Sequence, residues 1–300
     1  MELGALLECL SNPSCLLTHV TNALVLAMVL FLVASGLSLI LGVLGVLNFA
    51  HGSLYMLGAY FTYTIMTMTG NFGVSAILAS IGVGILGVGV ERVFIRRVYG
   101  APLLFQLLLT YGFILVLDDA VKLIWGYKYH SIGLPETFRR PPWTIAGTFI
   151  PSYYVLTIVV GAFVAVALWL FLSRTRLGKI IVAAAHDVEM VSALGINVPL
   201  LFTIVFGIGA ALAGLGGVMA GPVRSVFPGM GFSVVVDSFI VVVIGGLGSV
   251  GGAFFGALLL GLSQSLGAVG FPSFEESLPF ILMALVLIVR PQGIMGKVEG

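Results

Sequence analysis

The chain has 300 residues, of which 60% are hydrophobic and 8% are charged, whereas soluble domains carry roughly 25% charged residues. This composition excludes an ordinary soluble domain and predicts a polytopic membrane protein. The formal net charge of +1 excludes the strong positive potential that nucleic-acid binding requires, so no nucleic-acid partner is expected.

Residues 1–18 are expected to form a short N-terminal tail. The tail carries Glu2 and Glu8 but no Lys or Arg, unlike the basic start of a cleaved signal, so the first hydrophobic span is expected to direct membrane insertion. Cys9 and Cys15 are the only cysteines. Two free thiols are the preferred interpretation, a short disulfide is the alternative if the tail faces an oxidising compartment, and no metal site is expected.

Hydrophobic runs of about 20 residues, the length of one membrane crossing, recur through residues 19–291, which we predict to form one transmembrane domain. The expected fold is an all-α polytopic membrane protein with about nine transmembrane helices, eight or ten being the alternatives, and some of them glycine-broken or re-entrant. The expected spans are 20–41, 43–68, 74–90, 103–124, 153–172, 200–220, 233–247, 251–269 and 278–289.

Basic residues cluster after the third, fifth and ninth expected spans. With nine crossings the clusters share one side, which the positive-inside rule assigns to the cytoplasm. Residues 1–18 are then extracytoplasmic, and residues 292–300 form a cytoplasmic tail. The opposing observation is the segment 122–140, which places four basic residues outside and whose aromatic and proline residues indicate a structure at the membrane interface. The three clusters consist of Arg92, Arg96, Arg97, Arg174, Arg176, Lys179, Arg290 and Lys297.

Residues 174–199, RTRLGKIIVAAAHDVEMVSALGINVP, gather charged and helix-forming residues between two long apolar runs. We predict a short helix here, because Asp187 is a good N-cap, Glu189 suits the first turn and Gly195 can end a helix in the left-handed conformation. Pro199 fits the first turn of the next helix. The helix is expected either to dock on a partner or to remain an ordinary solvated helix. Its apolar side consists of Val188, Val191, Ala193 and Leu194.

Three polar residues, Asn48, His51 and Ser53, lie in the otherwise apolar stretch LGVLNFAHGSLYMLGAY. Burying them without partners costs several kcal/mol, so they are expected either to line or brace a pathway or to cap and cross-link helices. No carboxylate or nucleophile stands nearby in sequence, and no catalytic residue is expected.

The run GGLGSVGGAFFGALLLG contains glycines that are expected to serve helix packing or a hinge. It matches G-x-G-x-x-G, but membrane spans flank it and the Lys of a P-loop is missing, so no nucleotide site is expected. The spacing of Gly248, Gly252 and Gly256 predicts one smooth helix face. A weak correspondence between 42–60 and 245–261 indicates two structural repeats. The assigned glycines are Gly245, Gly246, Gly248, Gly251, Gly252 and Gly256.

Two adjacent carboxylates, Asp118 and Asp119, lie near the end of the fourth expected span. Intramembrane carboxylates often bind protons or cations. Lys122 is one helical turn away, however, and we therefore prefer a structural ion pair at the membrane interface.

Five motifs occur in a fixed order: GVLNFAHGSLYMLGAY, RTRLG, AAAHDVEMVSALGINV, VVVIGGLGSVGGAFFGALLLG and RPQGIMG. Through them the chain resembles, from about residue 20 to 296, the membrane permease subunits of bacterial ABC importers for branched-chain amino acids. The resemblance implies a bacterial inner-membrane protein that pairs with itself or a related permease, sits on two cytoplasmic ATPases and receives substrate from an extracytoplasmic binding protein.

The resemblance further implies that the loop at 173–198 couples the permease to an ATPase. Gly178, Asp187, Glu189 and Gly195 match the family's loop, whereas Val182 departs from it, because related loops often carry Arg there. ATP would be used by the partner subunits, and this chain would bind no cofactor.

The function expected is ATP-driven import of a branched-chain or similar small apolar amino acid by alternating access, with no chemistry performed by the chain itself. Asn48, His51 and Ser53 would line or brace the route. The alternative is an ion- or proton-coupled secondary transporter or channel for a small solute such as urea or an amide, which would use Asp118 and Asp119.

Overall fold

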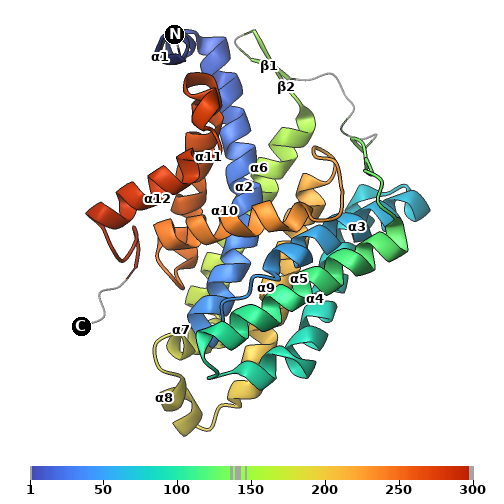
Figure 1. Cartoon of the computed structure of the whole chain (residues 1–300), viewed down its shortest axis with the longest axis vertical. Coiled ribbons are helices and arrows are strands. Elements are labelled where there is room, and N and C mark those ends of the chain that lie inside the picture. The colour runs from blue at the N-terminus through green and yellow to red at the C-terminus, as the bar shows by residue number, and fades with distance from the viewer. Residues whose placement is uncertain (1, 136–137, 139–142, 146, 297–300) are drawn as a thin grey trace.

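The computed structural model describes residues 2–135, 138, 143–145 and 147–296. Arg139, Arg140, Pro141, Pro142 and Lys297, which entered the topology argument, lie outside these residues. The elements, shown in Figure 1, are α1 (Glu2–Ser11), α2 (Pro13–Leu44), α3 (His51–Thr69), α4 (Phe72–Val93), η1 (Ile95–Val98), α5 (Leu103–Trp125), β1 (Trp143–Ile145), β2 (Thr148–Ile150), α6 (Ser152–Arg174), α7 (Arg176–Ala184), α8 (Val188–Ala193), α9 (Val198–Ala220), α10 (Met230–Gly245), α11 (Val250–Gly270), η3 (Pro272–Phe274) and α12 (Leu278–Val289).

Each expected span overlaps one helix of the described chain, namely α2, α3, α4, α5, α6, α9, α10, α11 or α12. The second span, expected at 43–68, was placed too early, since residues 43 and 44 belong to α2 and the break at 45–50 precedes α3. Five of these, α2, α4, α6, α9 and α11, are long and apolar enough to cross a membrane, and α10 and α12 are shorter apolar helices. The all-α membrane class is therefore confirmed, while the count of about nine crossings stays a prediction. The small antiparallel hairpin of β1 and β2 was not expected.

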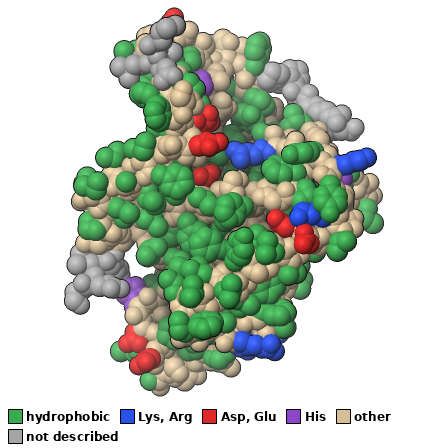
Figure 2. Space-filling model, viewed as in Figure 1, with side chains coloured by type: hydrophobic (Ala, Val, Ile, Leu, Met, Phe, Trp, Pro, Cys, Tyr) green, Lys and Arg blue, Asp and Glu red, His purple; other side chains and the backbone are tan. Residues whose placement is uncertain are grey.

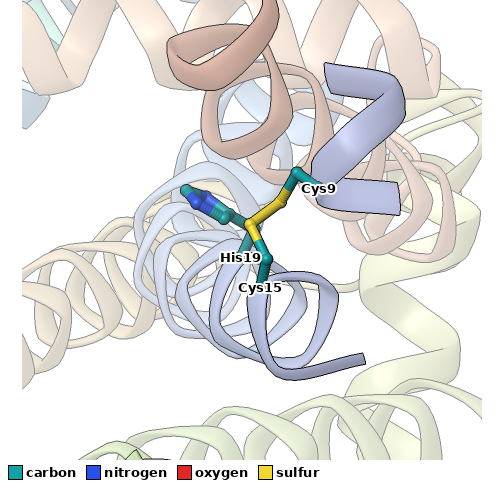
Figure 3. A group of neighbouring side chains, drawn as sticks. All are labelled: Cys9, Cys15 and His19. Atoms are coloured by element: carbon teal, nitrogen blue, oxygen red, sulfur yellow. A yellow bond between two sulfur atoms is a disulfide. The ribbon is translucent and has the colours of Figure 1, made fainter. Parts of the chain in front are cut away.

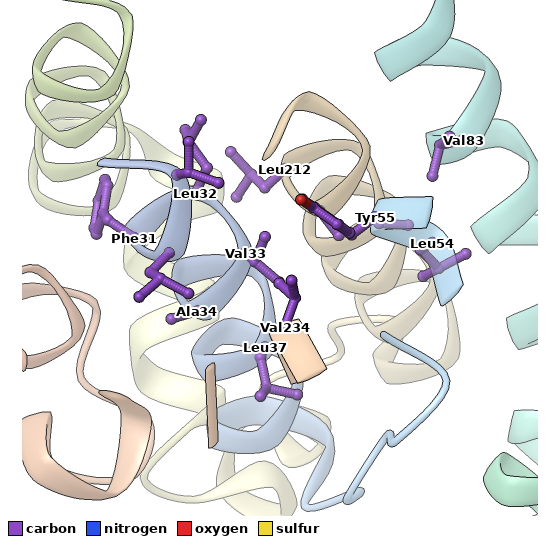
Figure 4. Close-up of a cluster of buried hydrophobic side chains, with 14 of the residues drawn as sticks. Phe31, Leu32, Val33, Ala34, Leu37, Leu54, Tyr55, Val83, Leu212 and Val234 are labelled. Carbon is purple, nitrogen blue, oxygen red and sulfur yellow. The ribbon is translucent and has the colours of Figure 1, made fainter. Parts of the chain in front are cut away.

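Helix α2 is the centre of the fold. It is 32 residues long, and it is apolar on every side because α6, α9, α10 and α11 surround it. In a bilayer, where lipid is as apolar as the protein, such a core is held by close packing and dispersion more than by removal from water. Figure 4 shows this packing through Phe31, Leu32, Val33, Ala34 and Leu37 of α2, with Tyr55 of α3, Leu212 of α9 and Val234 of α10.

The helices form two similar halves, α2–α5 and α9–α12. In the first half, α3 and α4 both pack on α9 of the second half. In the second half, the corresponding helices α10 and α11 both pack on α2 of the first half. The halves meet at two reciprocal glycine contacts, Gly36 with Gly209 and Gly52 with Gly231, in each of which a side chain on either residue would collide with the other's carbonyl. Since α2 and α9 run in opposite directions (Figure 1), the halves are inverted repeats.

This arrangement corrects the predicted repeat. The break between α2 and α3, at 45–50, corresponds to the break between α9 and α10, at 221–229, and not to the glycine run at 245–261. That run instead contains the short turn between α10 and α11, which matches the turn between α3 and α4. The sequence comparison failed because the two true breaks share no local glycine pattern.

Replacing Gly52 with alanine is expected to destabilise the protein by about 1–3 kcal/mol, because the added methyl meets the backbone of Gly231, which cannot move without shifting α10. The matched control is Gly112→Ala on α5, where nothing lies within 4 Å of the new methyl. It should be neutral or slightly stabilising. Unfolding temperatures in detergent test both, and equal temperatures for the two variants would contradict the close contact.

The N-terminal residues form helices and a disulfide instead of an irregular tail with free thiols. Asn12 separates α1 from α2 and caps α2, its Oδ1 accepting a hydrogen bond from Ser14 N at 3.1 Å. The turn brings Cys9 and Cys15 to a Cα separation of 5.2 Å, and they are bonded (Figure 3). The expectation of free thiols was wrong, since sequence spacing does not show that the chain turns back here.

The two ends of the molecule differ in character. The disulfide end, defined by Cys9 and Cys15, also holds the β1–β2 hairpin, whose Thr148 donates from Oγ1 to Ser14 O at 2.9 Å. The α8 end, defined by α7 and α8, lies at the opposite extreme of the long axis (Figure 1). Disulfides persist in oxidising compartments, and the external position of residues 1–18 stays a prediction.

Candidate functional site

The break between α2 and α3, together with the first turn of α3, holds the three polar residues expected to serve transport. Helix α2 ends at Leu44, since Gly45 adopts a left-handed conformation with φ of 64°, and α3 begins at His51. The exposed fractions of Asn48, His51 and Ser53 are 1%, 0% and 3%. All three side chains therefore lie inside the helix bundle and away from its lipid-facing surface.

These buried groups are incompletely satisfied. His51 Nε2 lies 3.0 Å from the carbonyl oxygen of Val33 on α2, and since a carbonyl only accepts, Nε2 is the donor. His51 Nδ1 and both side-chain amide atoms of Asn48 have no hydrogen-bond partner among the described residues. Each buried polar group without a hydrogen bond destabilises the fold by about 1–3 kcal/mol. The break is thus a place where a rearrangement of helices would gain hydrogen bonds, and the role of these residues in transport stays a prediction.

The segment at 174–199 forms two short helices, α7 and α8, where one was expected. Thr175 caps α7, its Oγ1 accepting from Gly178 N at 2.9 Å. Asp187 caps α8, its Oδ1 accepting from Met190 N at 2.8 Å. The predicted N-cap is confirmed, and the additional helix α7 arises because Thr175 provides a second cap.

The end of this segment also matches its sequence. Gly195 has a φ of 80°, which allows the chain to leave α8 in the left-handed conformation. Glu189 lies in the first turn of α8, and Pro199 lies in the first turn of α9, where Asn197 Oδ1 accepts from Leu200 N at 3.0 Å. The loop is therefore a defined structure held by its own caps.

Only part of the expected apolar side of α8 is buried, and the rest is exposed. Val191 is 3% exposed, whereas Met190 and Leu194 are 65% and 75% exposed. Gly178 is buried, and a side chain there would collide with the backbone of α6 at Phe171. Gly178 thus seats α7 on α6, and Met190 of α8 and its C-cap Leu194 are exposed apolar side chains.

The glycine run mainly serves packing between α10, α11 and α2. A side chain on Gly252 or Gly256 would crowd the backbone of α10 at Gly245. Gly248 does not belong to the predicted helix face. It precedes α11 with a φ of 78° and packs against Gly42 of α2, because the chain must turn between α10 and α11 before the helical spacing begins.

Part of the expected C-terminal tail closes the end of α10. Ile294 N donates to Ile244 O at 2.8 Å, and Met295 N donates to Gly245 O at 2.9 Å. These carbonyls have no partner within their own helix. A side chain on Gly246 would collide with the backbone at Gly296, so residues 292–296 pack on the helix bundle.

A buried carboxylate near the α8 end was not recognised from the sequence. Glu91 of α4 has an exposed fraction of 0%. Its carboxylate accepts from Arg96 Nε at 3.2 Å, Tyr99 OH at 2.8 Å and Thr203 Oγ1 at 2.7 Å. Arg96 Nη2 also donates to Pro199 O at 3.2 Å. This network, the Glu91 cluster, ties α4 and η1 to the first turn of α9, directly after α8.

Tyr99 supplies a permanent donor to this cluster. Burial raises the pKa of Tyr99, and the hydrogen bond to Glu91 raises it further, so the phenol stays protonated at physiological pH. The sequence did contain a signal for the cluster. Glu91 directly follows a long apolar run, and a carboxylate in that position requires a partner.

Of the two carboxylates considered for ion coupling, Asp119 forms a surface ion pair, whereas Asp118 is half-buried and forms no ion pair with another described residue. Lys122 Nζ donates to Asp119 Oδ1 at 2.8 Å, and the Asp119 side chain is 71% exposed. The preferred interpretation, a structural ion pair, is confirmed. An exposed, paired carboxylate lacks the desolvation that a coupling site requires.

Comparison with known proteins decides the family. The family described as branched-chain amino acid transport system / permease component matches residues 19–289. The chain belongs to this family. It is therefore a permease subunit of an ABC importer, as its motifs implied, and a multi-pass membrane protein.

Individual members of related transport systems align with most of this chain. The high-affinity branched-chain amino acid transport system permease protein BraD of Pseudomonas aeruginosa is 35% identical over 94% of this chain and 96% of its own. The corresponding LivH protein of Escherichia coli is 30% identical over 94% and 96%. LivM of Escherichia coli is 26% identical over 90% of this chain and 68% of its own. No solved structure gives a significant match.

Proposed function

We propose that this permease imports branched-chain amino acids through the bacterial inner membrane, driven by two cytoplasmic ATPases, one of which binds α8 of this chain. The capped helix α8 carries the proposal, because it presents Met190 and Leu194 to solvent at one extreme of the molecule. An apolar helix side of this kind fits a groove on a partner. The Glu91 cluster would pass the movement of α8 to α4 through the first turn of α9.

The names of the relatives support the proposed substrate and partners. Their names describe branched-chain amino acid transport, and two different permeases of Escherichia coli, LivH and LivM, both match this chain. Pairing with a second permease, identical or related, is thus part of the proposal. An extracytoplasmic binding protein would deliver the substrate, and the chain itself would catalyse no reaction and bind no cofactor.

The proposed orientation places the disulfide end outside and the α8 end in the cytoplasm. The disulfide between Cys9 and Cys15 supports it, as do the basic residues that follow α4 and α6. The ATPase that binds this chain would then meet α7 and α8 on the side where ATP is available.

The test is leucine uptake by proteoliposomes that hold the whole importer. We expect uptake to require both the binding protein and ATP inside the vesicle, and to stop when the ATPases carry a substitution that prevents hydrolysis. Uptake that persists without hydrolysis and follows an imposed ion gradient would contradict the proposal.

A further inference from the structure

A cavity of about 360 Å³ lies at the disulfide end, between α2, α11 and the break that connects α9 to α10. Figure 2 shows acidic and basic side chains gathered beside a hollow in the upper half of the molecule. The volume lies at the lower end of the roughly 300–1,000 Å³ of ligand pockets. None of the residues assigned to transport from the sequence lines this cavity.

The cavity combines one cation, one anion and an apolar wall. Arg224 and Glu275 both line it and are exposed; neither forms a close ion pair with another described residue, although the carboxylate of Asp237 lies within electrostatic reach of Arg224. Two amides, Asn22 and Gln264, add hydrogen-bonding groups. The apolar wall consists of Val25, Leu26, Val29, Met219, Ala220, Val223 and Ala268.

Hydrogen bonds between lining residues, and between the Arg224 loop and a neighbouring segment, fix the walls of the cavity. Ser265 Oγ donates to His19 O at 2.7 Å, and His19 Nδ1 lies 3.1 Å from Ser265 O, which joins α2 to α11 and leaves Nε2 for a ligand. The loop that carries Arg224 is fixed by paired backbone hydrogen bonds between Val226 and His130, both 2.8 Å. The cavity is thus a built feature of the fold.

We propose that this cavity is the external entry site for the substrate and that it binds an apolar α-amino acid in its zwitterionic form. Arg224 pairs with the carboxylate, Glu275 pairs with the ammonium group, and the apolar wall receives the side chain. A guanidinium is suited to carboxylates through its parallel N–H donors. The inference rests on the proposed import function, because it takes the external face of the molecule to be the disulfide end.

The cavity can be probed with one engineered thiol, because Cys9 and Cys15 are joined in a disulfide. Val223→Cys places the thiol in the wall, and its reaction with a membrane-impermeant maleimide is followed in the reconstituted complex. Leucine at about ten times its Kd should slow labelling roughly tenfold, because the reagent needs the empty cavity. Leucinamide and N-acetyl-leucine, which each lack one charge, should protect far less. Ala268→Cys is the second probe, should the first variant fail to fold.

Arg224→Gln is expected to weaken protection by leucine at least roughly tenfold, since one charge-assisted hydrogen bond is lost, whereas Arg97→Gln at the α8 end should leave it unchanged. The proposal is overturned if leucine does not protect either engineered thiol from the maleimide. It is also overturned if leucine protects the thiol in the Arg224→Gln variant as well as it does in the chain that keeps Arg224. It is also overturned if protection follows the phosphatidylethanolamine content of the vesicles, since that lipid shares the zwitterionic chemistry. ATP-driven uptake in the same preparation shows separately whether the import function holds.

Discussion

The double substitution Met190→Glu and Leu194→Glu is expected to lower ATP-driven leucine uptake at least roughly tenfold, because an apolar anchor removed from an interface costs about 2 kcal/mol or more. Each 1.4 kcal/mol is about a factor of ten. Both side chains are exposed, at 65% and 75%, so the permease itself should keep its fold. Uptake by proteoliposomes and co-purification with the ATPases measure the effect.

The matched control replaces an equally exposed apolar residue at the other end of the molecule. Phe149 of β2 is 71% exposed, and Phe149→Glu replaces one exposed apolar side chain with a carboxylate without touching α8. It should keep both ATPase binding and uptake. If the α8 variant binds the ATPases and transports as well as this control does, α8 is not the docking surface.

Arg96→Ala is expected to destabilise the protein by about 3 kcal/mol, because it leaves the fully buried carboxylate of Glu91 without its countercharge. The hydroxyls of Tyr99 and Thr203 still donate to this carboxylate, which keeps the effect at the lower end of the range for broken buried pairs. Glu91→Gln should destabilise the protein less, by about 1–2 kcal/mol. The Arg96 side chain is 38% exposed, so water can solvate its charge once the carboxylate is gone. Unfolding followed by tryptophan fluorescence in detergent measures both.

Arg97→Ala is the control for this series. Arg97 is the next residue along the same 3-10 helix and is exposed, so the change should alter stability by no more than about 0.5 kcal/mol. An Arg96→Ala chain that unfolds at the temperature of the Arg97→Ala chain would show that the Glu91 cluster does not hold α4 to α9.

Much of the local structure follows from the sequence. Runs of apolar residues predicted the approximate positions of nine helices, since a membrane span must satisfy its backbone hydrogen bonds within the helix and therefore needs a long apolar run. The caps of α8 were predicted for a similar reason. Asp187 and Gly195 act on backbone groups within a few residues, and this chemistry is visible in the sequence itself.

Contacts between distant parts of the chain were predicted poorly. Thr203 meets Glu91 across 112 positions of sequence, and nothing in the residues around either one indicates the partner. The repeat was matched to the wrong glycines for the same reason. Gly52 and Gly231 meet because α3 and α10 cross closely, and only the packed bundle shows which glycines lie at a crossing.

The sequence by itself thus determined the membrane class, the helix positions, the capped loop at 174–199 and, through its motifs, the family. The tertiary structure decided that Cys9 bonds to Cys15, that Glu91 is buried in a cluster, and that Arg224 and Glu275 share a cavity. The division has a physical cause. Apolar length and caps act over a few neighbouring residues, whereas these pairings depend on how helices pack, which no short pattern encodes.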